Sequence, residues 1–503
     1  MTPPATNNPQ ARDTRDIGIK PNILLIMSDE HGPMFSSTYG HPIVRTPGMD
    51  ALAARGAVFE SAYCNSPLCV PSRMSFLAGK HVHRVAAYDN HAPLAPDVPT
   101  WAHLLRAAGY QVVLDGKMHF VGPDQRHGFE AQLSPRYAAI TPAVAGAEWR
   151  DEHPMGGPGA RQRILEAGPG RGPHLDRDDE VEAVALDWLR QPARNDAPWC
   201  LTASFITPHF PLIVPEPYFS RYYPHNVDAP VLSPGFPEGL HPAHERVRRT
   251  FNLYDYTEEQ IRVARAAYYG LVTFMDEKLG HLVDALRETG QLENTVVIYT
   301  ADHGELAGDH GLWWKNSFYE QSARVPLIVS WPGQIDGGLR LGGATSLVDV
   351  ARTLLDIAGA PDPGDWDGDS LLPRLRAARA GTAGDVLSAT AAAAETGWKD
   401  EAICEYYAHA TNRPHRMLRS GRWKYNYYHG EAPELYDLHA DPQEHHNLAG
   451  QPHTAATESA LHRRLLAGWD PTVVERQVRR SQRDRNLIAL GDGGRTRRGR
   501  PPH

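Results

Sequence analysis

The sequence predicts an α/β fold in which helices flank a large mixed, mostly parallel sheet, followed by a smaller C-terminal α+β domain. The apolar run Asn22–Met27 is continuous rather than alternating, as expected of a strand that is buried on both faces. Helix and strand patterns then alternate along the chain, which is typical of a parallel sheet. Beyond residue 385, short strand patterns follow one another instead.

The helices of the first part are marked by their end residues. We expect helices over Met49–Gly56, Pro71–Gly79 and Thr100–Ala108, because glycine follows a helix end, proline suits a first turn and threonine is a good cap. A strand over Gln111–Leu114 follows the third helix. The stretch 131–195 is rich in Gly, Pro and Arg, so we expect long loops over the functional face there.

A long amphipathic helix is expected after residue 257. Thr257–Gln260 forms a capping box, and Gly290 ends the helix. One face carries its apolar residues, namely Leu271, Met275, Leu279, Leu282 and Leu286. Strands over Thr295–Thr300 and Val325–Ser330 follow.

Composition shifts divide the chain into four parts. A flexible N-terminus (1–20) precedes the catalytic domain (21–385), which ends after a stretch rich in Asp, Gly, Pro and Ala. The smaller α+β domain (386–470) has strands near Ile403–Tyr407, Met417–Leu418 and Lys424–Tyr428. A basic helix and tail (471–503) close the chain, and we expect this arginine-rich tail to be solvated.

Overall composition excludes several classes of protein. A net charge of −9 over 503 residues disfavours a general nucleic-acid binder. No apolar run approaches the roughly 20 residues of a membrane span, and 4 cysteines make no disulfide framework. The N-terminus lacks the apolar core of a secretory signal. We therefore expect a cytoplasmic protein with no membrane or nucleic-acid partner, while a homo-oligomer stays open.

Two acidic residues stand at predicted strand ends. Asp29 follows the first strand and Asp302 a later one, and His303 and Gly304 come next. Ligands of open α/β sheets bind beyond the carboxyl ends of the strands. Two carboxylates brought together there repel each other unless a cation lies between them, and a hard divalent metal is the natural cation. Either residue alone is equally well explained as a cap or an ion-pair partner.

A cysteine motif supplies a candidate nucleophile. Cys69 precedes the helix that Pro71 opens, and Arg73 lies in its first turn. Helix N-termini favour anions and activated nucleophiles. A lone cysteine is usually a small buried hydrophobe, but C-x-P-S-R followed by x-x-x-L-x-G is far more specific.

Several cations and histidines complete the set of candidates. Lys117 and His119 are two residues apart and would share one side of an extended strand. His209 follows Thr207-Pro208, and Lys315 comes thirteen residues after Asp302. Each alone is a weak signal, but together they provide what hydrolysis of an anionic ester requires.

The chain resembles the formylglycine-dependent sulfatases of the alkaline phosphatase superfamily. The resemblance spans residues 21–469 and is carried by Pro21–Asp29, Thr46–Gly56, Cys69–Lys80, Asp302–Lys315 and Leu435–Leu448. Within that family it is most similar to choline sulfatases, through Ala62–Cys69, Ala87–Asn90, Gly116–Phe120, Gly122–Gln125, His127–Glu130 and Ser322–Val329.

This resemblance implies the cofactors. Cys69 would be oxidised to formylglycine by a formylglycine-generating enzyme, and its hydrated aldehyde would attack sulfur. One divalent cation would be held by Asp29, Glu30, Asp302, His303 and the modified Cys69. Mostly hard oxygen ligands favour Ca²⁺, and the histidine admits Mn²⁺. Relatives commonly have Asp or Gln at the position of Glu30.

The resemblance also assigns roles to the remaining residues. Arg73 would orient the nucleophile, and Lys117 and Lys315 would hold the sulfate. His119 would accept a proton from residue 69, and His209 would protonate the leaving alcohol with help from Lys315. Asn90 and Phe120 would contact the substrate.

The resemblance implies that the substrate would be a sulfate monoester of a small alcohol or phenol. Choline-O-sulfate fits, with Tyr88, Phe120 and Trp149 as aromatic candidates for a cage, and an aryl or alkyl sulfate fits as well. However, Pro135–Trp149 lacks the aromatic-rich sequence of choline sulfatases, and Thr207 stands where relatives often have histidine. The alternatives are a phosphonate monoester or phosphodiester hydrolase, an unmatured binding module, and an interaction protein built on the arginine tail.

Overall fold

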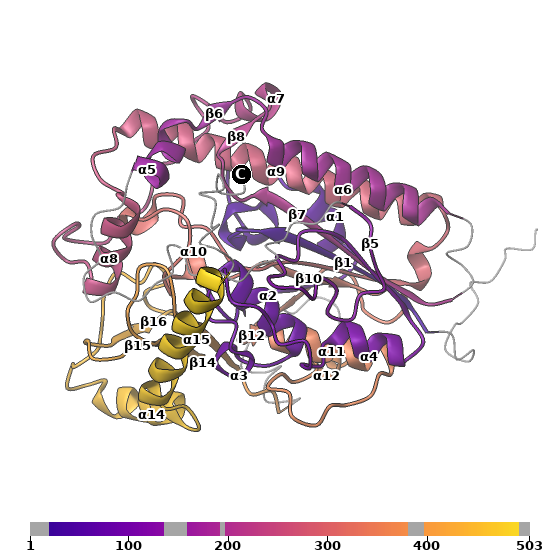
Figure 1. Ribbon diagram of the computed structural model, residues 1–503. Coiled ribbons are helices and arrows are strands. Elements are labelled where there is room, and N and C mark those ends of the chain that lie inside the picture. The colour runs from indigo at the N-terminus through magenta and orange to yellow at the C-terminus, as the bar shows by residue number, and fades with distance from the viewer. Residues whose placement is uncertain (1–19, 135–157, 192–196, 381–396, 492–503) are drawn as a thin grey trace, which may run out of the picture.

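An eight-stranded sheet forms the centre of the molecule (Figure 1). We describe a computed structural model over residues 20–134, 158–191, 197–380 and 397–491. The sheet has the order β11-β2-β10-β9-β1-β7-β4-β5. Its strands are β1 (Asn22–Asp29), β2 (Ala57–Phe59), β4 (Gln111–Gly116), β5 (Ala131–Gln132), β7 (Trp199–Pro208), β9 (Thr295–Ala301), β10 (Leu327–Ser330) and β11 (Leu339–Leu341).

Five neighbouring strands, from β9 through β1, β7 and β4 to β5, run parallel. β10 is antiparallel to both β9 and β2, which makes the sheet mixed. The predicted mixed, mostly parallel α/β fold is therefore confirmed. Four short strands form two separate pairs outside this sheet. β3 (Ala62–Tyr63) pairs with β12 (Thr345–Ser346), and β6 (Gly168–Pro169) pairs with β8 (Ile213–Val214).

Helices cover both faces of the sheet because the central strand is apolar on both faces. Ile23, Leu25 and Met27 pack into one core, whereas Leu24 and Ile26 pack into another. The first core is covered by α2 (Cys69–Ala78), α4 (Trp101–Ala107), α11 (Leu347–Ala358) and α12 (Leu372–Ala380), and the second by α1 (Pro47–Ala53), α6 (Pro173–Arg190) and α9 (Glu258–Glu288) (Figure 1). Shorter helices are α3 (Val82–Val85), α5 (Pro158–Leu165), α7 (Glu216–Phe219), α8 (Pro242–Phe251) and α10 (Glu320–Ala323).

The expectation of long loops over 131–195 is wrong for much of that stretch. α5 and the eighteen-residue helix α6 lie within it, and α6 packs against α9 and β7. Its buried apolar residues recur at helical spacing, at Leu175, Val181, Ala185, Trp188 and Leu189. Apart from the buried Asp178, the Arg, Asp and Glu residues of α6 are exposed or partly exposed, and their number made the stretch look like a loop when it was judged by composition.

The C-terminal unit is a four-stranded antiparallel sheet in the order β13-β14-β15-β16, with one helix packed on it. Its elements are β13 (Glu401–Tyr406), β14 (His415–Ser420), β15 (Trp423–Tyr428), β16 (Glu434–Asp437) and α14 (Ala455–Leu466). All of the predicted N-terminus (1–20) except Lys20, the boundary at 385 and the tail beyond 491 lie outside the described residues.

The last helix, α15 (Pro471–Gly491), is not simply a solvated basic helix. It packs Val474 and Val478 against Tyr88 and Tyr407. Arg485 also donates to both oxygens of Asp89, at 2.8 and 2.5 Å, and both side chains are buried. Within the described ranges, no helix combines the length and apolarity that crossing a membrane would require.

The Arg485–Asp89 pair gives a stability prediction. Arg485→Ala should lower the free energy of unfolding by about 3–5 kcal/mol, because it leaves the carboxylate of Asp89 buried without its cation. Denaturant unfolding of the purified protein measures the change. Arg483→Ala is the matched control on the same helix, since the Arg483 side chain is 67% exposed and should shift stability by no more than about 0.5 kcal/mol. Equal effects of the two substitutions would contradict the structural role of Arg485.

Candidate active site

The candidate residues gather at the carboxyl edge of four adjacent parallel strands. Ser28 of β1 pairs with Ala301 of β9, so the next residues, Asp29 and Asp302, come side by side. On the other side of β1, Asp29 pairs with Pro208 of β7, which His209 follows. Gly116 of β4 pairs with Ser204 of β7, and Lys117 follows it. The strand registers alone therefore bring two acids, a histidine and a lysine together.

Arg73 bridges the two carboxylates. Its Nε donates to Asp302 Oδ2 at 2.7 Å and its Nη2 to Asp29 Oδ2 at 2.9 Å. Its Nη1 donates to the carbonyl of Lys117 at 2.6 Å and to Ser204 Oγ at 3.0 Å. All three charged side chains are fully buried. One guanidinium thus holds the outer oxygen of each carboxylate and leaves the inner oxygens facing each other.

The inner atoms form a group that suits a divalent cation. Asp29, Cys69, Asp302 and His303 each offer one ligand atom, and these atoms lie within 4.8 Å of one another. His303 Nε2 lies 3.2 Å from Cys69 Sγ, 3.8 Å from Asp29 Oδ1 and 3.6 Å from Asp302 Oδ1. Two buried carboxylates, an imidazole and a sulfur form a donor set that fits a metal ion.

Cys69 is the first residue of α2, two residues earlier than the predicted start of the helix. Asn90 Oδ1 accepts a hydrogen bond from the amide of Val70 at 3.0 Å, and Ser72 Oγ donates to the carbonyl of Asp302 at 2.6 Å. These contacts fix the start of the helix against the metal-binding edge. Burial and the nearby carboxylate of Asp29 raise the pKa of the Cys69 thiol to about 12.

Lys117 lies against Asp29. Its Nζ is 2.5 Å from Asp29 Oδ2, so that oxygen contacts two cations. Burial alone would raise the pKa of Asp29, but Lys117 and Arg73 help to hold it well below its ordinary value. His119 follows nearby, where burial and Lys117 lower its pKa.

A second group surrounds Lys315. Its Nζ donates to Glu30 Oε2 and to His209 Nε2, both at 2.9 Å. His209 Nδ1 is 2.7 Å from the carbonyl of Phe210, to which it donates, so Nε2 is left to accept from Lys315. Burial and Lys315 lower the pKa of His209, which keeps the ring neutral. Glu30 lies outside the group of four, but it forms a second group of possible metal ligands with Asp29 and His209, and burial raises its pKa to about 8.

Asn90 and Phe120, the two remaining predicted substrate contacts, lie in different surroundings. Asn90 reaches the start of α2, as described above. Phe120 is only 1% exposed and lies in the core, with its ring against those of His127 and Phe129. Tyr88 is likewise buried, against Tyr407, and Trp149 lies outside the described residues.

Three contributors were not predicted from the sequence. Ser204 binds Arg73, Asp89 is held by Arg485, and Asp178 of α6 binds the end of β7. The helical spacing of Leu175 through Leu189 was the available signal for Asp178, because it places that residue on the buried face of α6. Nothing local marks the other two.

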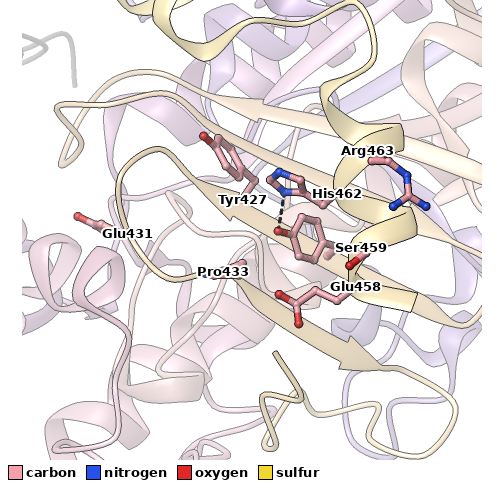
Figure 2. A pocket seen from close by; sticks show the side chains of 8 residues that line it. Tyr427, Glu431, Pro433, Glu458, Ser459, His462 and Arg463 are labelled. Carbon is pink, nitrogen blue, oxygen red and sulfur yellow. Dashed lines mark hydrogen bonds between the residues drawn. The ribbon is translucent and has the colours of Figure 1, made fainter. Parts of the chain in front are cut away.

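A hollow of about 460 Å³ lies elsewhere, in the C-terminal unit (Figure 2). Tyr427 and His462 line it together with Glu431, Glu458 and Arg463, and His462 Nδ1 is bonded to the hydroxyl of Tyr425 at 3.0 Å. None of its lining residues belongs to the groups around Cys69 or Lys315.

Comparison with known proteins agrees with this arrangement. Residues 21–360 match the sulfatase family model, and residues 308–469 match the N-sulphoglucosamine sulphohydrolase C-terminal model. The chain is 37% identical over 499 residues to the choline-sulfatase of Rhizobium meliloti (strain 1021), covering 94% of this chain and 92% of the relative. It is 32% identical to arylsulfatase K of Bos taurus, covering 86% of this chain and 78% of the relative.

Solved structures share the fold. BT4656, in complex with its substrate D-glucosamine-2-N,6-O-disulfate, superposes with a TM-score of 0.71 at 23% identity, covering 91% of this chain and 98% of that one. The phosphonate monoester hydrolase of Agrobacterium radiobacter gives 0.69 at 26% identity, covering 89% and 95%. With this match over most of its length and two acids, a cysteine and a histidine gathered at one sheet edge, the chain belongs to the sulfatase family and is a sulfuric ester hydrolase.

Proposed function

We propose that this sulfatase hydrolyses the sulfate monoester of a small organic alcohol or phenol, with a formylglycine made from Cys69 as its nucleophile. The observation that carries the proposal is the packing of Cys69 against His303 and the inner oxygen of Asp29, under the guanidinium of Arg73. A small anionic ester needs such a site, with a nucleophile beside a metal and cations for the departing sulfate.

The sequence around Cys69 supports its conversion. It is the C-x-P-S-R motif through which the chain resembles the formylglycine-dependent sulfatases. The conversion requires a formylglycine-generating enzyme as a maturation partner.

Asp29, Asp302, His303 and residue 69 are the residues that would hold the cation. When bound, a divalent cation supplies a Lewis acid that favours ionisation of a hydroxyl at residue 69. Two carboxylates favour Ca²⁺, with Mn²⁺ as the alternative because of His303. We assign Glu30 to holding Lys315 rather than to the cation, because it pairs with Lys315 at 2.9 Å.

The other charged residues of the site have separate proposed roles in catalysis. Arg73 orients residue 69, and Lys117 and Lys315 bind the sulfate oxygens. His119 accepts a proton from residue 69 as sulfate leaves. His209 and Lys315 deliver a proton to the leaving alcohol. The ammonium group of Lys315, which donates to Nε2 of the neutral His209 at 2.9 Å, is the source of that proton.

The relative with 37% identity is a choline-sulfatase, so choline-O-sulfate is the first ester to test. Tyr88 and Phe120 are aromatic candidates for a choline cage, and both are as buried as Cys69 and Lys117. An aryl sulfate or another small alkyl sulfate is the alternative. A cytoplasmic location stays a prediction.

Mass spectrometry tests the nucleophile. In active protein, the tryptic peptide that ends at Arg73 should carry an aldehyde at residue 69, whereas Cys64 of the same peptide should still take up an alkylating agent. Cys69→Ala should abolish sulfate release. Active protein in which both cysteines of this peptide are alkylated would exclude formylglycine.

Substitution of His209 tests the leaving-group step. His209→Ala should lower kcat on alkyl sulfates by about 10²–10⁴-fold, because their alkoxides need a proton to depart. Activated aryl sulfates should lose much less, since their phenolates leave unprotonated. Steady-state kinetics on both ester classes measure the difference, and an equal loss would remove His209 from this role.

A phosphonate monoester hydrolase is the second candidate, because one such enzyme superposes on the chain at 26% identity. We expect a higher kcat/KM for an aryl sulfate than for the matching aryl phosphonate monoester or phosphodiester. Parallel assays on protein of measured aldehyde content decide between them. A clear preference for the phosphonate would reverse the assignment.

A further inference from the structure

A buried carboxylate of α6 binds the end of β7. Asp178 is fully buried, and its Oδ1 accepts a hydrogen bond from the amide of Ile206 at 2.7 Å. Its Oδ2 accepts from the amide of Thr207 at 2.7 Å and from Thr207 Oγ1 at 2.6 Å. One side chain thus binds three donors within two consecutive residues. Figure 1 shows α6 running alongside β7, between the sheet and solvent.

These bonds constrain the geometry at the end of β7. A buried carboxylate is costly unless it is well hydrogen-bonded, and burial raises the pKa of Asp178 to about 6 although its three bonds oppose this. Any shift of Ile206 or Thr207 would weaken a charge-assisted hydrogen bond in a dry environment. The two residues are therefore held more firmly than a strand end ordinarily is.

The held segment leads directly to His209. The peptide bond Thr207–Pro208 is cis, and the amide of His209 donates back to the carbonyl of Ile206 at 3.0 Å. Ile206 is thus bound by Asp178 on its amide and by His209 on its carbonyl. The imidazole then reaches Lys315 at 2.9 Å.

We propose that Asp178 is a positioning residue that fixes His209 for proton delivery to the leaving alcohol. This inference rests on the proposed role of His209. The hydrogen bonds of Asp178 go to Ile206 and Thr207 rather than to a proposed sulfate-binding or metal-binding residue, so it acts through the turn from Ile206 to His209. Displacement of a catalytic group by about 1 Å is enough to cost on the order of 10²-fold in rate.

Two substitutions of different severity test the proposal. Thr207→Val removes one donor to Asp178 and keeps the shape of the side chain, and Asp178→Ala removes the acceptor of all three bonds. We expect kcat on alkyl sulfates to fall by about tenfold for Thr207→Val and about 10²-fold for Asp178→Ala. Activated aryl sulfates should be affected much less by either substitution.

Asp179→Asn is the matched control. Asp179 is the next residue of α6, and its half-exposed carboxylate pairs with Arg171 and Lys278 instead of β7. Its substitution should leave the ratio of alkyl to aryl rates unchanged. A change of that ratio as large as the one caused by Asp178→Ala would overturn the proposal.

A double-mutant cycle separates positioning from a general structural effect. On a His209→Ala background, Asp178→Ala should cause no further loss on alkyl sulfates, because the group it positions is absent. Additive losses, or equal losses on both ester classes, would overturn the proposal. If circular dichroism shows that Asp178→Ala does not fold, the proposal is tested by Thr207→Val alone. An unchanged kcat of Thr207→Val on alkyl sulfates would then contradict the proposal. If His209→Ala itself lowers both classes equally, the proposed function fails at its leaving-group step instead.

Discussion

The site depends on the repulsion between two buried carboxylates and on how that repulsion is relieved. Asp29 and Asp302 are brought together by the pairing of β1 and β9, where water cannot screen them. Arg73 binds the outer oxygen of each, and Lys117 adds a second cation to Asp29. The inner oxygens are left with Cys69 and His303, in a space that a divalent cation would complete. The proposed nucleophile, metal ligands and sulfate-binding cations are all positioned by this single arrangement.

The proposed leaving-group side of the site depends on a different interaction, centred on Lys315. Lys315 is shared between Glu30 and His209, so a proton donor and a neutral acceptor lie 2.9 Å apart in a buried environment. His209 follows β7, whereas the proposed metal ligands Asp302 and His303 follow β9. The two ends of the site are linked at the end of β1, where Asp29 belongs to the proposed metal-binding group and Glu30, the next residue, pairs with Lys315.

Local patterns allowed much of this to be predicted. The continuous apolar run of β1 and the acids at two strand ends indicated the sheet and its functional edge, because a parallel sheet aligns its carboxyl ends. Contacts between distant residues could not be predicted in this way. Arg485 and Asp89 are 396 positions apart in the sequence, and no local pattern around either residue indicates that the two side chains form an ion pair. Phe120 was expected at the substrate, and its contact with His127 and Phe129 could not be predicted because packing brings these rings together.

The most direct test of the account is anomalous diffraction from crystals of the matured protein grown with Mn²⁺, a substitute that scatters strongly near its absorption edge. The account predicts one strong peak bonded to the inner oxygens of Asp29 and Asp302 and to His303, with an oxygen of residue 69 as a further ligand. A peak elsewhere, or residue 69 turned away from an ion bound between the two carboxylates, would contradict it.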